Sequence, residues 1–259
     1  MGTSQEQIAK LKSEVLESKG DHWLDIIPME GPVHRVRLTQ PFYLGVHEVT
    51  QAQFRQFVVA EAYKTDAERS GKGGFIPDGV GGNKLDPKAS WRNPYNYDVK
   101  DDFPVLQVSW NDAQEFCLWL SKKEGRTYRL ATEAEWEFAG RAGSVGLFSF
   151  GDDPFERTKH AVSQQAAPML VGSKTPNPFG LFDMEGNAWE FCADWFGPYS
   201  GTAETNPQGM PDGTTRAMRG GSYMHRSWAS RPAMRGAVPP GESHACNGFR
   251  VALVGNLKP

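Results

Sequence analysis

The chain has 259 residues, and 39% of them are hydrophobic, so it can bury the core of one large domain or of two small ones. Its 28 Lys and Arg residues nearly balance its 31 Asp and Glu residues, and the formal charge is −3. With so small a net charge, the composition does not indicate a basic surface that binds polyanions, so nucleic acid is not a predicted partner. No stretch approaches the roughly 18 to 20 apolar residues that cross a bilayer, so no membrane span is predicted.

The first residues carry charged side chains, among them Lys10, Lys12 and Glu14, and contain no apolar signal core. The chain as given is therefore expected to be soluble. A signal peptide removed ahead of Met1 is compatible with this sequence, so no compartment is assigned.

The three cysteines, Cys117, Cys192 and Cys246, are odd in number and show no C-x-x-C spacing. Neither a disulfide scaffold nor a zinc ribbon is indicated, and buried free thiols are expected. The 28 glycines, 18 prolines and 8 tryptophans indicate many turns held around aromatic side chains. We expect a loop-rich fold.

Apolar residues at helical spacing within residues 5–19 indicate either a short helix or a frayed leader, in an N-terminal leader assigned to residues 1–32. Extended patterns at 34–38 and 42–46 predict strands. Capping signals and helical spacing predict helices that start at Thr50, at Ser109 or Asn111, and at Thr132. The second of these helices should end at Gly125, and its buried face should contain Ala113, Phe116, Cys117, Leu118 and Leu120.

Residues 65–101 are rich in Gly, Lys, Asp and Asn and predict a long surface loop. Such a loop either shapes a binding site or has no functional role. The sequence of residues 143–182 predicts mostly turns and short strands. No Pro- or Ser-rich linker divides the chain, so residues 33–259 are predicted to form a single domain.

The segment GLFDMEGNAWEF contains hard oxygen ligands. Asp183 and Glu190 supply carboxylates, and the carbonyl groups of Gly186 and Ala188 can complete a cage that suits calcium. The alternative is a turn with solvated carboxylates.

Three blocks of sequence resemble the formylglycine-generating enzyme (sulfatase-modifying factor) family in order and spacing. They are FPVLQVSWNDAQEFCLWLSKKEGRTYRLATEAEWEFAGRAG at 103–143, NPFGLFDMEGNAWEFCADWFG at 177–197 and RAMRGGSYMHRSWASRPAMRG at 216–236, followed by NGFRVAL at 247–253. The resemblance covers about residues 33–254. It implies an α+β fold related to C-type lectins, with little regular secondary structure.

The family's structural calcium site matches Asp183, Gly186, Ala188 and Glu190, with Asp183 in place of an Asn. The resemblance therefore implies structural calcium here. The family's other calcium site would fall near residues 159–175, where no clear ligand set is kept, so it is not carried over.

The family's two copper-binding catalytic cysteines are missing. Their positions correspond to His225 and to Ser230, or to Ala229 if one gap is allowed. Copper(I) prefers thiolates, and one imidazole with a hydroxyl is a poor substitute, so formylglycine formation is not expected. His225 is left with three roles: a metal ligand together with a residue such as His244, an acid or base near neutral pH, or a hydrogen-bonded structural residue.

Other residues of the family's pocket are kept, since Trp189 and Ser222 match residues that line it. Tyr223, Trp228 and Arg226 are further candidates for the pocket wall, by stacking or by binding a carboxylate. For each of them, packing or structural pairing is the alternative.

Two functions are compatible with these residues. The first is a cysteine-independent oxidoreductase acting on a peptide or small molecule, like the relatives linked to pyoverdine maturation. The second is a non-catalytic module that binds a peptide or small-molecule ligand, like the family's inactive paralogue. Calcium is structural in both cases, and copper or iron belongs only to the first.

Overall fold

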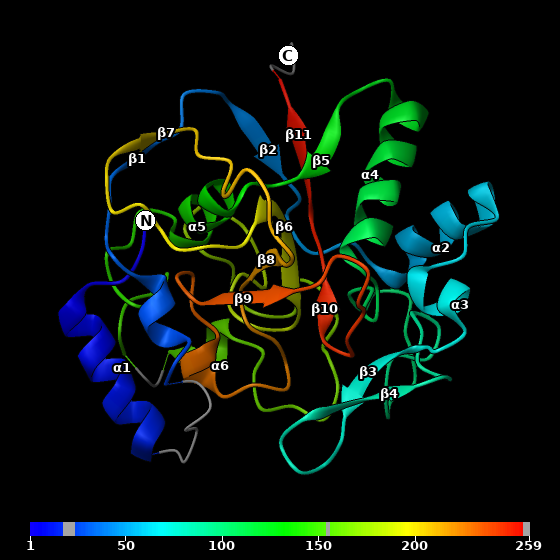
Figure 1. Cartoon of the computed structure of the whole chain (residues 1–259), viewed down its shortest axis with the longest axis horizontal. Helices are drawn as coiled ribbons and strands as arrows, with labels where there is room; N and C mark the ends of the chain where they lie inside the picture. The colour runs from blue at the N-terminus through cyan, green and yellow to red at the C-terminus, as the bar shows by residue number, and fades with distance from the viewer. Residues whose placement is uncertain (18–23, 154–155, 256–259) are drawn as a thin grey trace.

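The computed structural model describes residues 1–17, 24–153 and 156–255. Its central sheet has the strand order β10-β6-β8-β9 (Figure 1). Strand β6 (Trp189–Trp195) pairs in parallel with β10 (Asn247–Gly248) and antiparallel with β8 (Arg216–Arg219), which pairs with β9 (Arg235–Val238). The predicted α+β fold is confirmed.

Three smaller sheets complete the strand content of the described residues. Strand β11 (Val251–Val254) lies between β2 (Phe42–Leu44) and β5 (Tyr128–Leu130), and both pairings are antiparallel. Strand β1 (Val36–Arg37) pairs with β7 (Glu204–Thr205), and β3 (Gly74–Pro77) with β4 (Asn83–Asp86). Because these strands have at most four residues, their ladders alone cannot hold the fold together.

Three of the predicted helices begin where side chains cap them. Helices α2 (Gln51–Glu61), α4 (Trp110–Glu124) and α5 (Glu133–Arg141) start after Thr50, Ser109 and Thr132, each in a complete capping box. All three predicted starts are thus confirmed, with Ser109 rather than Asn111 as the cap of α4. The other helices of the described residues are α1 (Gln5–Glu17), α3 (Asp66–Ser70), α6 (Arg157–His160) and the 3-10 turns η2 (Ile27–Glu30) and η3 (Ser227–Ala229).

Two local expectations need correction. Leu118 was expected on the buried face of α4, but it is 54% exposed because α4 packs through Ala113, Phe116 and Cys117. Residues 65–101 were expected to be a loop, yet they contain α3 and the β3–β4 hairpin. The composition missed these elements because they are short and lie at the surface, where an apolar period is weak.

The hydrophobic core is built from aromatic rings. Phe54 contacts Phe57, Trp91, Phe116 and Phe249 with ring centroids 5.4 to 6.4 Å apart. These rings come from α2, α4, the segment after β4 and the turn before β11, so they join elements far apart in the sequence. Helix α1 adds Ile8, Leu11 and Val15 to the same core.

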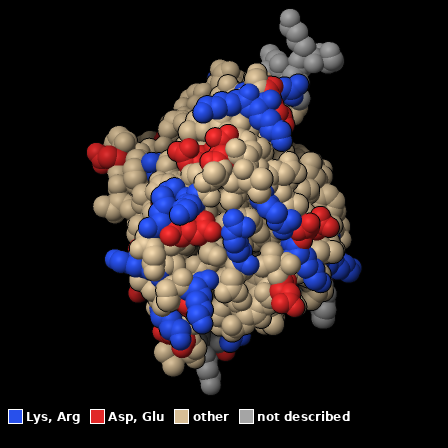
Figure 2. Space-filling model, turned by 90° about the vertical axis from the view of Figure 1, so that its right-hand side faces the viewer, with Lys and Arg blue, Asp and Glu red and all other residues tan. Residues whose placement is uncertain are grey.

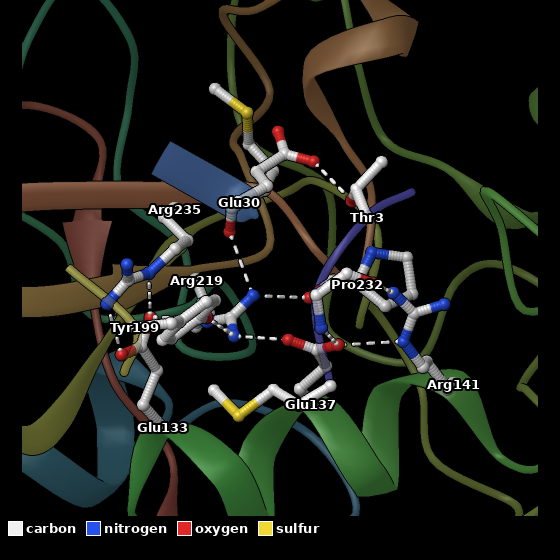
Figure 3. Close-up of polar contacts among 12 residues, drawn as sticks. Thr3, Glu30, Glu133, Glu137, Arg141, Tyr199, Arg219, Pro232 and Arg235 are labelled. Carbon is white, nitrogen blue, oxygen red and sulfur yellow. Dashed lines mark hydrogen bonds and ion pairs between the residues drawn. The ribbon is translucent and has the colours of Figure 1, made fainter. Parts of the chain in front are cut away.

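Arginine and glutamate side chains form a second, polar core between α5 and the central sheet (Figure 3). Arg219 is fully buried; its Nη2 lies 2.5 Å from Glu137 and its Nε 3.0 Å from Glu133. Arg235 binds both oxygens of Glu133 at 2.6 and 2.7 Å. Burial opposes ionisation of Glu137, but the guanidinium groups of Arg219 and Arg141 lower its pKa to about 2. Glu137 is therefore charged at neutral pH.

The N-terminal residues join this polar core. The Gly2 amide donates to Glu137 at 2.7 Å, and the Thr3 hydroxyl donates to Glu30 at 2.7 Å. Glu30 in turn accepts two hydrogen bonds from Arg231, at 2.6 and 2.7 Å, and both of these side chains are fully buried. The ionic contacts thus connect the start of the chain to its C-terminal third.

The face that carries α2, α3 and α4 shows Lys and Arg side chains interleaved with Asp and Glu (Figure 2). It presents no broad area of a single charge. None of the helices in the described ranges is long and apolar enough to cross a membrane.

Replacing Arg219 by methionine should remove the charge that Glu133 and Glu137 share. Each glutamate keeps one other arginine, but both lose a partner inside the protein, so we expect unfolding free energy to fall by about 3 to 5 kcal/mol. Urea denaturation followed by tryptophan fluorescence measures the change.

The matched control is Arg55→Met, because Arg55 pairs with Asp101 at the surface, where the two side chains are 44% and 64% exposed. That change should cost less than about 1 kcal/mol. Equal losses of unfolding free energy in the two variants would show that the buried ion pairs stabilise the protein no more than an exposed pair does.

Candidate functional site

A sharp turn after β8 forms the base of the candidate site. Gly220 and Gly221 have φ angles of +92° and +75°, which residues other than glycine rarely adopt. A Cβ on Gly221 would lie 2.5 Å from the Ala229 carbonyl oxygen and 2.9 Å from the Ser230 Cα. Glycine is therefore needed for the 229–230 backbone to pack against the turn that presents Ser222.

Ser222 and His225 form a hydrogen-bonded pair. The Ser222 Oγ lies 2.6 Å from Nδ1 of His225, and the His225 amide donates to the Ser222 carbonyl oxygen at 3.1 Å. The ring of Trp189, the first residue of β6, meets the imidazole edge-on with centroids 5.8 Å apart. The structure thus brings together His225, predicted as a catalytic position, and Trp189 and Ser222, predicted for the pocket.

Cys246 lies next to this pair. A hydrogen bond with Ser222 favours its thiolate, but burial dominates and raises the pKa of the thiol to about 11. Cys117 and Cys192 are buried elsewhere in the core, and burial raises the pKa of both. All three cysteines are free, as predicted. None is a thiolate at neutral pH, so none replaces the missing catalytic pair.

The other predicted site residues take different positions. Ser230 is fully buried behind Gly221, and its hydroxyl makes no hydrogen bond in the described part of the chain. Trp228 is buried in the hydrophobic core, whereas Arg226 is exposed. Tyr223 is buried, and its amide donates to the Asn187 carbonyl oxygen.

Tyr97, which the sequence did not single out, packs edge-on against Tyr223 with centroids 6.1 Å apart. Burial raises the pKa of both phenols above the usual range, so both stay protonated. Tyr97 comes from the 65–101 segment, so that segment does reach the neighbourhood of the site. The clustering of Tyr95 and Tyr97 in an otherwise polar stretch was the available signal.

The residues near His225 do not suit copper or iron. Nδ1 of His225 is engaged by Ser222, so at most one ring nitrogen could bind a metal, and the neighbouring thiol has a raised pKa. His244 stacks on Phe75 at 4.7 Å and faces Glu242 at 3.4 Å. Among the residues with described positions, no three His, Cys, Asp or Glu side chains gather as metal ligands. Redox metals need more ligands than this.

The predicted calcium ligand Glu190 is already engaged. Arg250 donates to both of its oxygens at 2.6 Å, and Trp136 Nε1 donates to Oε2 at 2.7 Å. All three side chains are buried. The carbonyl oxygen of Gly186 likewise accepts the Ala188 amide at 2.7 Å.

A carboxylate missed by the sequence reading lies beside Asp183. Glu48 is fully buried and interacts electrostatically with Asp183. Oε2 of Glu48 and Oδ1 of Asp183 are buried and accept no hydrogen bond from a third group within the described residues. The two carboxyl groups lie close enough for a hydrogen bond between Glu48 and Asp183, which lowers the pKa of Asp183. Burial raises the pKa of both groups, and repulsion from Asp183 raises that of Glu48 further. Two unsatisfied buried carboxylate oxygens are what a hard cation needs.

The arrangement of sheets, turns and site defines a formylglycine-generating-enzyme-like protein, as expected from the sequence. The sulfatase-modifying factor enzyme 1-like domain matches residues 3–254. The chain belongs to this family, and it lacks the family's cysteine pair.

The formylglycine-generating enzyme of Streptomyces coelicolor is 35% identical over 273 residues, covering 90% of this chain and 85% of that one. The inactive Cα-formylglycine-generating enzyme 2 of Bos taurus is 32% identical over 200 residues and covers 64% of each chain. Among solved structures, PvdO from Pseudomonas aeruginosa has a TM-score of 0.70 at 29% identity, covering 88% of this chain and 86% of that one.

Proposed function

We propose that the protein is a cysteine-independent oxidoreductase that acts on a peptide or small molecule at the Ser222–His225 pair. The observation that carries the proposal is the 2.6 Å hydrogen bond between the Ser222 hydroxyl and Nδ1 of His225. It supports an acid–base role for His225, the residue that corresponds to one of the family's catalytic cysteines when the sequences are aligned without a gap. The chain also shares its fold with PvdO over 88% of its length.

In this proposal His225 accepts one of the two protons that the substrate loses and passes it to the reduced oxygen, which takes the other proton as well, and Ser222 orients the ring. A two-electron oxidation of a C–H/N–H or C–H/O–H group releases two protons and two electrons. Dioxygen is the oxidant, and its reduction to hydrogen peroxide balances the reaction. The ring of Trp189 packs edge-on against the imidazole, with ring centroids 5.8 Å apart.

The alternative is a non-catalytic module that binds a peptide or small molecule. Burial of Trp228 in the core and of Ser230 behind Gly221 favours it, because these two residues serve packing. The similarity to the inactive bovine relative is in line with such a role.

The test measures oxygen uptake and hydrogen peroxide formation with a panel of reduced peptides and small phenols. With a productive substrate, His225→Gln should lower kcat by about 10² to 10⁴-fold, the usual contribution of a general acid or base. His160→Gln is the matched control, because His160 is distant in sequence and stacks on Phe150; it should leave kcat unchanged.

Two results would contradict the proposal. One is turnover that His225→Gln leaves intact. The other is a panel member that binds at this site without oxygen uptake, which would support the binding module instead.

We further propose that the protein binds one structural calcium ion through Glu48 and Asp183, aided by the carbonyl groups of Gly186 and Ala188. Glu190 then acts through Arg250 and supports the site without binding the ion. The two unsatisfied oxygens of Glu48 and Asp183 support this assignment. A divalent cation would also remove the repulsion between the two carboxylates.

Calcium added after chelation should raise the melting temperature, because a ligand at 100 times its Kd stabilises the native state by about 2.7 kcal/mol. Glu48→Gln should remove most of that response, since it deletes one charged ligand. Asp212→Asn, at an exposed position, should respond like the wild type. Differential scanning calorimetry measures the shifts, and a full calcium response in Glu48→Gln would rule out this ligand set.

A further inference from the structure

A cavity of about 490 Å³ lies between helix α5 and the segment that runs from β1 into β2. Figure 1 shows α5 below this segment. The described residues that line the cavity are separate from the Ser222–His225 pair and from the proposed calcium ligands. Its volume falls within the roughly 300 to 1,000 Å³ of sites that bind small molecules.

The two walls of the cavity follow from two sequence periods. The wall on α5 is one face of the helix, at the i, i+3, i+4 and i+7 positions 134, 137, 138 and 141. The opposite wall takes every second residue of an extended segment, namely Val36, Leu38, Gln40 and Phe42. A helix face and a largely apolar strand face thus lie on either side of a space that their side chains leave open.

Phe138 is the apolar side chain of α5 that remains in contact with solvent. It is 53% exposed, whereas its neighbours Glu137 and Ala139 are buried. Its ring meets that of Phe179, which is itself 52% exposed, with centroids 5.6 Å apart. Removing apolar surface from water is favourable, so a ligand that covers Phe138 in the cavity gains affinity from the contact.

The charged groups of the wall are already engaged. Glu137 lies 2.8 Å from Nε of Arg141 and 2.5 Å from Nη2 of Arg219, and the other two nitrogens of Arg141 donate to backbone carbonyl oxygens at 3.1 and 2.8 Å. The α-ammonium group of Met1 donates to the His34 carbonyl oxygen at 3.1 Å and is attracted by Glu137. The described wall therefore offers no free counter-ion, and burying a charged ligand in it would be costly.

We propose that this cavity binds a small uncharged aromatic molecule, held between Phe138 of α5 and Leu38 and Phe42 of the opposite wall. The rings of Phe42 and Phe138 suit an aromatic ligand, because aromatic rings attract one another when they are offset or edge-on. The exposed amide of Gln40 can hydrogen bond a hydroxyl or carbonyl group of the ligand. This binding site is independent of the oxidation proposed at His225.

The experiment is isothermal titration of the full chain at pH 7 with three ligands that share one ring system. They are neutral 2-naphthol, anionic 2-naphthoate and cationic 2-naphthylmethylammonium. We expect saturable binding of 2-naphthol to one site, and about tenfold weaker binding of both charged ligands, because their charges lose water without gaining a counter-ion.

Variants of both walls locate the binding site. Phe138→Ala and Leu38→Gln should each bind 2-naphthol roughly 10- to 100-fold more weakly, since each removes apolar contact. Phe138 is exposed and Leu38 is half-buried, so both variants should fold, and their melting curves check that. Leu118→Ala is the matched control, because Leu118 is 54% exposed on α4 and lies outside the cavity wall; it should bind like the wild type.

Three results would overturn the proposal. The first is no saturable binding of 2-naphthol to the wild type. The second is unchanged affinity in both Phe138→Ala and Leu38→Gln, which would place the ligand elsewhere. The third is binding of either charged ligand as tight as that of 2-naphthol, which would assign the cavity to an ionic ligand.

Discussion

The structure depends on buried pairs of arginine and glutamate side chains. Arg219, Arg231, Arg235 and Arg250 are almost fully buried, and each meets a buried carboxylate at 2.5 to 2.7 Å. A fold with so little regular secondary structure has few long backbone ladders, and these guanidinium groups also bind carbonyl oxygens of loops, such as Pro232 for Arg219. Removing one partner leaves a buried charge, so the pairs specify how the loops must meet.

The same pairs set the geometry of the candidate site. Arg219 directly precedes the Gly220–Gly221 turn, so its pairing with Glu133 and Glu137 anchors the segment that presents Ser222 to His225. Arg250 holds Glu190 and thereby leaves Glu48 and Asp183 as the unsatisfied carboxylates. The buried ion pairs thus engage Glu190, which supports the site, and leave one oxygen each of Glu48 and Asp183 able to bind a proton or a cation.

Local signals in the sequence predicted the helix starts, because a capping box such as Thr50 with Gln53 needs only four consecutive residues. The motifs predicted the family and its fold. They also singled out Trp189, Ser222 and His225, which lie in contact in the structure. The contribution of Glu48 could not be predicted, since it lies 135 positions before Asp183 and only tertiary packing joins them. The burial of Trp228 and the engagement of Glu190 by Arg250 depend on the same long-range contacts.

The proposed function requires that this family member works without a thiolate–copper site. The most direct measurement incubates the protein with copper(I), dioxygen and a peptide carrying the sulfatase cysteine, and then follows that cysteine by mass spectrometry beside the Streptomyces coelicolor enzyme. We predict an unchanged cysteine with this protein and its conversion to an aldehyde by the enzyme. Aldehyde formation by this protein would contradict the account.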